Sequence, residues 1–422
     1  MFSTAYPTRP LFAFSLLLLA GCAGGEKAPP TPVTPTLADY SRPLPPGTSA
    51  LRRITDPALM PDLAGAWGNR DVFLLEAIDQ SLKWFAAPSS RQFFPFEGIT
   101  HVQAEASLLA MQQLLEESPS ETAFIDDLTR QFDVYQSVGY DGSGTVLFTG
   151  YYAPVFEASR DRTDRFTCPL YHRPSDLVTD PVTGRPQGRR TADGGLEPYP
   201  TRREIEQSRM LRGSELVWLE DALNAYIVHV NGSAKLRLTD GSYMYIGYAG
   251  KTDRPYASLG RAMARTGLLR DGSVTLTSIK RVFREQPQRV QELMYENQNY
   301  VFFTEYAGDR WPAGSLGVQV TRESSLATDK SIYPRGGIVL VDTKAVNFSY
   351  DQRDFLRFML DQDTGGAIQA PGRADIYMGI GPSAEILAGG QYAEGRLYYL
   401  FLKPEFVEQY KRPERRVTRA GW

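Results

Sequence analysis

The sequence predicts a mainly β protein with helices, an α+β fold, whose C-terminal part forms a small barrel. Three observations support this prediction. The N-terminal third carries stretches with apolar residues at helical spacing. A middle segment alternates apolar and polar residues around Asp240-Gly241, the strongest short signal for a β-hairpin. The C-terminal part consists of short apolar segments between glycine-rich turns, which is typical of a small barrel.

The N-terminal helices are predicted from the spacing of their apolar residues. In the first helix, Val72, Leu75, Ile78 and Leu82 fall on one stripe at the helical period. A strand over Thr145–Tyr152 follows the last helix. The three predicted helices are Asp71–Phe85, His101–Glu117 and Thr122–Tyr135.

The middle of the chain changes character after this strand. A polar loop, Thr179–Pro200, leads to Thr201-x-x-Glu204, the pattern of a capping box at a helix N-terminus. The alternating segments Lys235–Leu238 and Tyr243–Tyr248 are expected to pair as a hairpin. Two further helices are expected, near Ala257–Ala264 and over Ser278–Asn297.

The C-terminal part is predicted to be mostly short strands, followed by a short basic and solvated tail over 404–422. The predicted strands are Leu316–Val320, Gly337–Val341, Phe355–Leu360, Asp375–Met378 and Leu397–Leu402.

Composition excludes several classes of function. The formal net charge of −3 over 422 residues gives no basic surface for nucleic acid, so no nucleic-acid partner is expected. Two cysteines cannot form a disulfide framework. The three histidines are scattered and match no metal-ligand spacing, so a metal site is not expected.

The N-terminus indicates a secreted, lipid-anchored protein. Arg9 precedes the apolar run Leu11–Ala20, which is too short to span a bilayer, so residues 1–21 are read as a signal peptide. Leu19-Ala20-Gly21-Cys22 resembles a bacterial lipobox, in which Cys22 would be acylated. An ordinary signal peptide with an incidental cysteine is the alternative. Ala23 resembles the outer-membrane version of the signal, which implies the periplasmic face of the outer membrane of a Gram-negative bacterium.

A proline-rich segment follows the lipidation site. Residues 22–46 contain too many prolines to form a core and are predicted to be an extended tether. At ~3.1 Å per residue the tether could hold the rest of the protein roughly 70 Å from the lipid.

Three aspartates in the C-terminal part are candidates for chemistry. Asp342 ends a predicted strand, Asp363 begins the glycine-rich run Asp363-Thr364-Gly365-Gly366, and Asp375 lies within the strand Asp375–Met378. Apolar neighbours predict a buried Asp375 with a pKa raised above about 3.9, as cleavage of a glycosidic bond requires of its acid. For Asp342 and Asp363, capping of turns is an equally good interpretation.

Several short motifs, taken in order behind a lipobox, resemble the membrane-bound lytic murein transglycosylase A family. The resemblance covers most of residues 140–403. This chain has Asn231-Gly232-Ser233-Ala234 where the family has Gln-Gly-Ser-Gly. The other motifs are Phe148-Thr149-Gly150-Tyr151-Tyr152, Leu170-Tyr171, Tyr248-Ala249-Gly250, Tyr300-Val301-Phe302-Phe303, Gly314-Ser315-Leu316-Gly317-Val318 and the three aspartates.

The resemblance implies a more specific architecture. A double-psi β-barrel would be assembled from the end of a helical region over 47–152 and from residues 313–403. A second, largely β domain over 153–312 would be inserted into it, with a groove for a glycan strand of peptidoglycan between the two domains.

The resemblance also implies roles for residues. Asp375 matches the catalytic aspartate, and Asp342 and Asp363 match its two companions. With the mechanism that the resemblance implies, the C6 hydroxyl of N-acetylmuramic acid attacks its own C1, and Asp375 alone serves as acid and base, without metal or organic cofactor. The expected substrate contacts are Thr149, Gly150, Tyr151, Ser233, Gly365, Gly366 and Tyr377.

Two other functions remain open. On the same barrel, Asp342 or Asp363 could activate water, which would make the protein a glycoside hydrolase of the inverting kind. A lipoprotein that binds peptidoglycan without cleaving it is the second alternative. The products released from purified peptidoglycan would separate the three.

Overall fold

The computed structural model describes residues 38–181, 184–270 and 274–412. The chain divides into two units, Met1–Ala38 and Asp39–Trp422, and apart from Ala38 the described residues belong to the second. The predicted signal peptide, Cys22 and most of the proline-rich segment lie outside the described residues. None of the described helices is long and apolar enough to cross a membrane.

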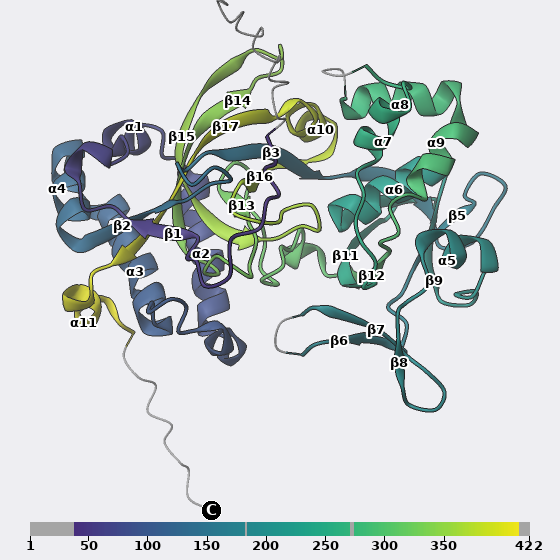
Figure 1. Cartoon of the computed structure of the whole chain (residues 1–422), viewed down its shortest axis with the longest axis horizontal. Helices are drawn as coiled ribbons and strands as arrows, with labels where there is room; N and C mark the ends of the chain where they lie inside the picture. The colour runs from purple at the N-terminus through teal and green to yellow at the C-terminus, as the bar shows by residue number, and fades with distance from the viewer. Residues whose placement is uncertain (1–37, 182–183, 271–273, 413–422) are drawn as a thin grey trace, which may run out of the picture. The chain divides into compact units, whose positions relative to one another are not determined.

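The centre of the second unit is a closed six-stranded barrel (Figure 1). Its strands follow one another in the order β17-β14-β15-β13-β16-β3, and pairing between β17 and β3 closes the ring. The β13–β15 and β16–β3 pairs are parallel, whereas the other pairs are antiparallel. This mixed, closed sheet agrees with the small barrel predicted from the sequence and with the double-psi barrel that the family resemblance implies. The barrel strands are β3 Val146–Ala153, β13 Ser325–Ala327, β14 Ile338–Val346, β15 Gln352–Asp363, β16 Arg373–Ile380 and β17 Tyr392–Leu402.

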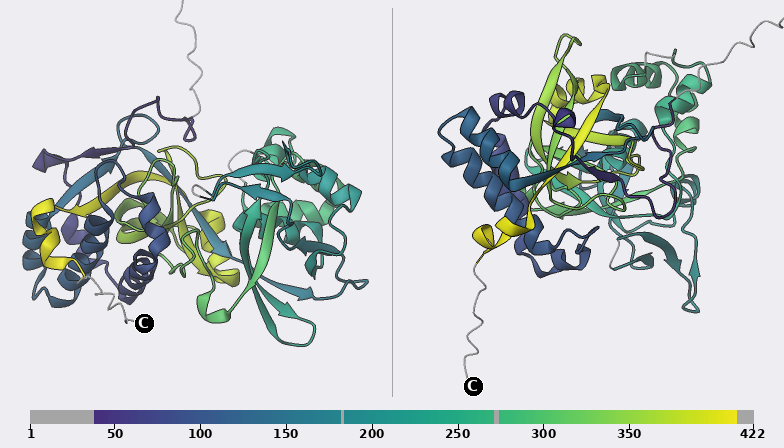
Figure 2. Two further views of the ribbon diagram at one scale, coloured as in Figure 1. Left: turned by 90° about the horizontal axis from the view of Figure 1, so that it is seen from below. Right: turned by 60° about the vertical axis from the view of Figure 1, so that its left-hand side comes forward.

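Two strands and four helices from the N-terminal part extend and cover the barrel. β1 (Leu51–Arg53) and β2 (Phe132–Ser137) continue the sheet beyond β17. The helices lie beside this end of the barrel in Figures 1 and 2, and their apolar faces join the barrel core. They are α1 Leu63–Gly68, α2 Val72–Ala86, α3 His101–Glu117 and α4 Glu121–Gln131.

Local sequence explains where these helices begin. Asp71, Thr100 and Ser120 each accept a backbone N–H of the following first turn through the side chain, which satisfies a donor that the helix itself leaves free. Leu74, Ala77, Ile78 and Leu82 of α2 are buried, whereas the predicted stripe residue Val72 is exposed.

Between β3 and β13 the chain forms a second domain with cores of its own. Its main sheet has the order β12-β11-β10-β4-β9-β5, and a small sheet, β6-β7-β8, accompanies it. The strands are β4 Val155–Ser159, β5 Cys168–Tyr171, β6 Leu177–Thr179, β7 Pro186–Arg190, β8 Leu196–Glu197, β9 Glu215–Leu219, β10 Ser233–Leu238, β11 Tyr243–Lys251 and β12 Val301–Tyr306. The helices are α5 Arg202–Ser208, α6 Ala222–Asn231, α7 Leu259–Arg265, α8 Leu276–Glu285 and α9 Pro287–Met294.

Two local predictions in this domain are confirmed. Thr201 and Glu204 form the capping box of α5. β10 and β11 pair as an antiparallel hairpin around Asp240-Gly241. The chain enters this domain directly from β3. Pro154 is the only residue between β3 of the barrel and β4 of the inserted domain.

Four predicted boundaries are wrong. The helix predicted over Thr122–Tyr135 ends at Gln131, because Phe132–Ser137 pairs with β17 as a strand. The helix predicted over Ser278–Asn297 is two helices, since Pro287 lacks an N–H and starts α9. Leu316–Val320 forms no strand and contributes only an isolated bridge at Gln319. Gly337–Val341 continues to Val346, so Asp342 lies within β14 and does not end it.

The C-terminal segment contains elements that the sequence analysis does not predict. α10 (Gly381–Gly390) lies between β16 and β17 and packs on β3. After β17, the short helix α11 (Val407–Tyr410) packs on α3, and Arg412 forms an ion pair with Glu105.

Candidate active site

A lateral row of residues across the barrel sheet brings the candidate aspartates into register. Ala327 in β13 pairs with Asp363 in β15 on one side and with Asp375 in β16 on the other. Asp375 in turn pairs with Thr149 in β3. Adjacent strands lie about 4.8 Å apart, so the backbones of the two aspartates are roughly 10 Å apart. The small side chain of Ala327 is the only one between them in this row.

Aromatic side chains share the face of this row. Tyr151 and Tyr377 follow Thr149 and Asp375 by two residues, and side chains two apart in a strand project to the same face. Their ring centroids lie 5.1 Å apart. The hydroxyl of Tyr377 is buried and has no hydrogen-bond partner among the described residues. The face of the sheet that carries Thr149 and Asp375 therefore also carries aromatic rings, a combination suited to binding a sugar.

The carboxyl group of Asp375 is buried, and this burial raises its pKa toward neutral pH. Its neighbours Ala374, Ile376 and Tyr377 are buried, and the Oδ1 atom is buried without a hydrogen-bond partner among the described residues. Burial raises the pKa of Asp375 to about 6, although the Arg373 guanidinium and a hydrogen bond from Thr149 act in the opposite direction. A carboxyl with this pKa can both donate and accept a proton near neutral pH.

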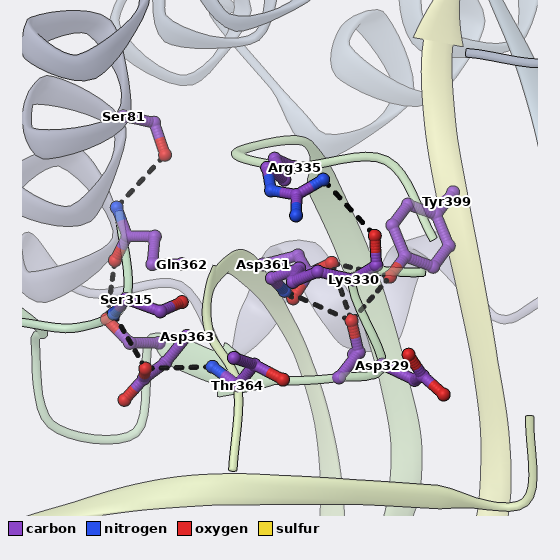
Figure 3. A network of polar contacts seen from close by, with 12 residues as sticks. Ser81, Ser315, Asp329, Lys330, Arg335, Asp361, Gln362, Asp363, Thr364 and Tyr399 are labelled. Atoms are coloured by element: carbon purple, nitrogen blue, oxygen red, sulfur yellow. Dashed lines mark hydrogen bonds and ion pairs between the residues drawn. The ribbon is translucent and has the colours of Figure 1, made fainter. Parts of the chain in front are cut away.

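Asp363 is held in a different environment. Its Oδ2 accepts the hydroxyl of Tyr151 at 2.8 Å, and its Oδ1 accepts the backbone N–H groups of Ser315 at 2.7 Å and Thr364 at 2.8 Å (Figure 3 shows the latter two). Burial raises the pKa of Asp363, and these hydrogen bonds oppose that shift. These three donors hold the carboxyl group of Asp363 in one orientation, near Tyr151 and Asp375.

A buried network beneath Asp363 was not predicted from the sequence (Figure 3). Asp361 is fully buried and pairs with the ammonium group of Lys330. Its Oδ2 also accepts the hydroxyl groups of Thr328 and Tyr399, both at 2.8 Å. The N–H of Thr328 donates to the backbone carbonyl of Asp363, so the network holds the end of β15 where the site begins. The predicted strand stopped at Leu360, which left Asp361 outside the predicted core.

Asp342 lies elsewhere. It is exposed in the middle of β14, opposite Leu356 and Arg396. Burial raises the pKa of Asp342, and the charged groups that act on it are those of Asp354, Asp62, Lys344 and Arg396, with neither Asp363 nor Asp375 among them. The structure brings Asp363 and Asp375 together and leaves Asp342 on another part of the barrel.

Gly150 faces away from the row of acids. A side-chain carbon at this position would lie 2.9 Å from the Cα of Ala388 and 3.0 Å from the Cβ of Gln391. These residues belong to the end of α10 and the residue after it, so the absence of a side chain at Gly150 lets α10 pack on β3. In this structure the side-chain position of Gly150 faces the end of α10 and Met378 of β16.

The other predicted contact residues lie on both domains. Gly365 and Gly366 form the loop after β15, which turns through a hydrogen bond from Ile368 N to Gly365 O. Ser233 begins β10 of the inserted domain, opposite Gly247. Ser233 makes no hydrogen bond to Asp363 or Asp375 in the part of the chain that the structure describes.

The inserted domain also contributes a residue that the sequence analysis missed. Tyr256 follows β11. Burial raises the pKa of its hydroxyl group, and the charges of Arg373 and Asp375 also influence this pKa. Tyr256 therefore lies near the catalytic candidate from the opposite domain. Only the fold could reveal this residue, since no local pattern marks it.

A separate cavity of about 190 Å³ lies inside the inserted domain. Arg202, His229 and Tyr300 are among the residues that line it, and neither Asp363 nor Asp375 takes part. Within residues 38–181, 184–270 and 274–412, no cluster of three or more potential metal ligands occurs.

Comparisons with known proteins agree with this arrangement. A family model described as the MltA specific insert domain matches residues 147–304, and one for the 3D domain matches residues 324–401. The membrane-bound lytic murein transglycosylase A of Vibrio cholerae is 33% identical over 270 residues, which are 63% of this chain and 68% of that protein. The protein of the same name from Escherichia coli K12 is 31% identical over 283 residues, 65% of this chain and 71% of that protein.

Solved structures extend the likeness to most of the chain. A membrane-bound lytic murein transglycosylase from Agrobacterium tumefaciens superposes with a TM-score of 0.69 at 26% identity, covering 86% of this chain and 100% of that one. MltA from Neisseria gonorrhoeae superposes with a TM-score of 0.59 at 28% identity, covering 86% of this chain and 97% of that one. E. coli MltA with bound chitohexaose gives 0.64 at 24% identity, covering 87% and 96%, which is evidence for the fold. This chain belongs to the membrane-bound lytic murein transglycosylase A family.

Proposed function

We propose that the protein is a lytic transglycosylase that cleaves the β-1,4 bond between N-acetylmuramic acid and N-acetylglucosamine in peptidoglycan without adding water. The observation that carries this proposal is the state of Asp375: a buried, unpartnered carboxyl oxygen on a group whose pKa is about 6. The reaction is proposed from the family to which the chain belongs, and Asp375 is proposed as the residue that performs it.

One carboxyl group suffices for this reaction. Protonated Asp375 donates its proton to the bridging oxygen as the bond to the muramyl C1 breaks. The resulting carboxylate then takes the proton of the muramyl C6 hydroxyl, which attacks C1 and closes a 1,6-anhydro ring. Because the nucleophile belongs to the same sugar, proximity replaces a second catalytic residue. Asp375 ends the cycle protonated, and no metal or organic cofactor is required.

Asp363 supports this chemistry through charge and position. A hydrolytic mechanism needs a second carboxylate that is free to take a proton from water. Both oxygens of Asp363 already accept hydrogen bonds, from Tyr151, Ser315 and Thr364. Its charge adds to the rise of the Asp375 pKa. We assign Asp363 the positioning of Tyr151 and the tuning of Asp375, which disfavours the hydrolase alternative.

The glycan strand is proposed to lie between the barrel and the inserted domain. Thr149, Tyr151 and Tyr377 would contact it from the barrel, and Tyr256 from the inserted domain. Aromatic rings suit the apolar faces of sugars, and the fold-related E. coli protein has been crystallised with chitohexaose. Ser233, Gly365 and Gly366 remain proposed contacts on the two sides.

We further propose that acylated Cys22 holds the enzyme on the periplasmic face of the outer membrane. The lipobox around Cys22 and the proline-rich segment after it support this proposal. The relatives named above are membrane-bound by their names.

Comparison of three carboxamide variants on purified sacculi tests the assignment. Asp375→Asn should lose cleavage by about 100-fold or more, because an amide neither donates nor accepts the proton. Asp363→Asn should retain a reduced activity, and Asp342→Asn should behave like wild type. Soluble muropeptides are quantified by liquid chromatography, and far-UV circular dichroism checks the fold. Activity of Asp375→Asn within a few-fold of wild type would exclude Asp375 from the mechanism.

A further inference from the structure

The last residue of β11, Lys251, reaches from the inserted domain toward the catalytic loop of the barrel. A side-chain carbon at Gly366 would lie 3.8 Å from the Nζ atom of Lys251. Gly366 belongs to the loop that follows β15, whose last residue is Asp363. The ammonium group therefore lies beside the active-site loop although its backbone belongs to the opposite domain.

The backbone around Lys251 is well fixed. Lys251 pairs with Val301 of β12, and the preceding Gly250 pairs with Phe302. The guanidinium group of Arg173 donates to the carbonyl of Ala249 at 3.0 Å. The direction in which the lysine side chain leaves the sheet is thus set by the fold of the inserted domain.

No carboxylate among the described residues pairs with this ammonium group. Lys251 forms no hydrogen bond or ion pair through its side chain with any residue in the described ranges. Burial alone lowers its pKa, without a contribution from any carboxylate. Asp363, the last residue before this loop, already accepts hydrogen bonds from three donors. A half-buried cation without a partner is unfavourable in the free protein, because it has lost part of its hydration.

We propose that Lys251 binds a carboxylate of a muramyl residue in the bound glycan strand and thereby selects peptidoglycan over neutral glycans. The inference rests on the function proposed above and names the chemistry of its substrate more closely. Two carboxylates meet the requirement: the lactyl group of a muramyl residue without a peptide, and a carboxylate of the stem peptide where one is attached. A chitooligosaccharide has neither.

Binding measurements in an Asp375→Asn background test this proposal without turnover. The probes are chitohexaose, peptide-free murein oligosaccharides and stem-bearing oligosaccharides, each titrated by calorimetry. Lys251→Met should weaken binding of a carboxylate-bearing probe by roughly 10- to 100-fold, the range for a hydrogen bond to a charged group. Binding of chitohexaose should not change. Lys251→Arg should retain most of the affinity, because it keeps the charge.

The matched control is Lys344→Met on β14, which removes an exposed lysine paired with the exposed Asp354 and should leave all three affinities unchanged. A loss confined to peptide-free probes assigns the lactyl carboxylate, and a loss confined to stem-bearing probes assigns the stem. A loss with both assigns a carboxylate in each. Equal weakening of chitohexaose, or no change with any probe, would overturn the proposal. Because these affinities do not depend on the products formed, they separate this inference from the proposed function.

Discussion

The two neighbouring carboxyl groups of the candidate site, those of Asp363 and Asp375, differ in their hydrogen bonding. Asp363 receives three donors, whereas the Oδ1 atom of Asp375 is buried without a partner. The first arrangement holds a carboxylate in place, and the second leaves an oxygen available for a substrate proton. This difference supports the proposal that Asp375 performs the catalysis and that Asp363 assists it.

If Asp375 is the catalytic acid, its pKa predicts how the rate of cleavage depends on pH. Its carboxyl group must be protonated to donate to the leaving oxygen, and burial places its pKa at about 6. We therefore predict that kcat/KM on a soluble murein substrate is constant below this pKa and falls tenfold per pH unit above it. Initial rates measured from pH 4.5 to 8 check the prediction. A decline that begins near pH 4, the value of an ordinary aspartate, would contradict it, and Asp342→Asn should leave the profile unchanged.

At the scale of elements, the site depends on strands that are held by buried contacts beneath it. The Lys330–Asp361 pair lies in the barrel core and connects the residues after β13 with β15 and β17. Through Thr328 it also fixes the backbone at Asp363. The position of the active-site loop is therefore coupled to the stability of the barrel.

We predict that Lys330→Met lowers the free energy of unfolding by about 3–5 kcal/mol, because it leaves Asp361 buried without its counter-charge. Urea denaturation followed by tryptophan fluorescence measures the loss. The exposed pair of Lys344 with Asp354 provides the control, and Lys344→Met should cost less than about 1 kcal/mol. Equal effects of the two substitutions would show that the buried pair contributes no more than a surface pair.

The contact of α10 with β3 makes a second prediction at this scale. Gly150→Ala would bring a methyl group to 2.9 Å from the backbone of α10 at Ala388, so the helix must shift. We expect a destabilisation of about 1–3 kcal/mol, visible as a lower thermal midpoint. Gly68→Ala, where nothing lies within 4 Å and the backbone is helical, should be neutral or slightly stabilising. A Gly150→Ala protein as stable as wild type would mean that α10 does not pack tightly on β3.

Local patterns predicted the elements well, and their failures have identifiable causes. The helices α2 and α3 and the β10–β11 hairpin follow from apolar spacing and turn residues within each segment. The strand at Phe132–Ser137 was missed because it forms by pairing with β1 and β17, both far away in the sequence. Likewise Lys251 and Tyr256 reach the site through the inserted domain, which no local pattern can indicate.

For the molecule as a whole, the barrel contains the candidate acids, and the inserted domain is proposed to form the opposite side of the site. The domains have separate apolar cores, and the chain passes between them next to the catalytic row, at β3. The family resemblance implied a barrel assembled from two parts of the chain, but the β17–β3 pairing that closes it is seen only in the structure, since strand order cannot be read from periodicity. Asp375 was proposed as the catalytic acid because it stands within an apolar strand, whereas the buried Asp361 was missed because the predicted strand Phe355–Leu360 ended one residue before it.

The anchor and the catalytic unit are predicted to be separable. Cys22→Ala should move the protein from the membrane fraction to the soluble fraction, because two or more acyl chains are needed for stable attachment. Activity of the purified variant on isolated sacculi should stay within about twofold of wild type, as a control that the catalytic unit is intact. Retention of Cys22→Ala with outer membranes after a salt wash would contradict the lipid anchor.

Incorporation of heavy oxygen tests the central claim, that Asp375 directs an attack by the substrate's own hydroxyl group. Sacculi are digested in water enriched in heavy oxygen, and the released muropeptides are weighed by mass spectrometry. We predict products that are lighter by one water than the hydrolysis products and carry no label at the muramyl C1, since no water enters the reaction. Labelled reducing ends as the main product would contradict the account, because they require a water molecule activated by a second carboxylate.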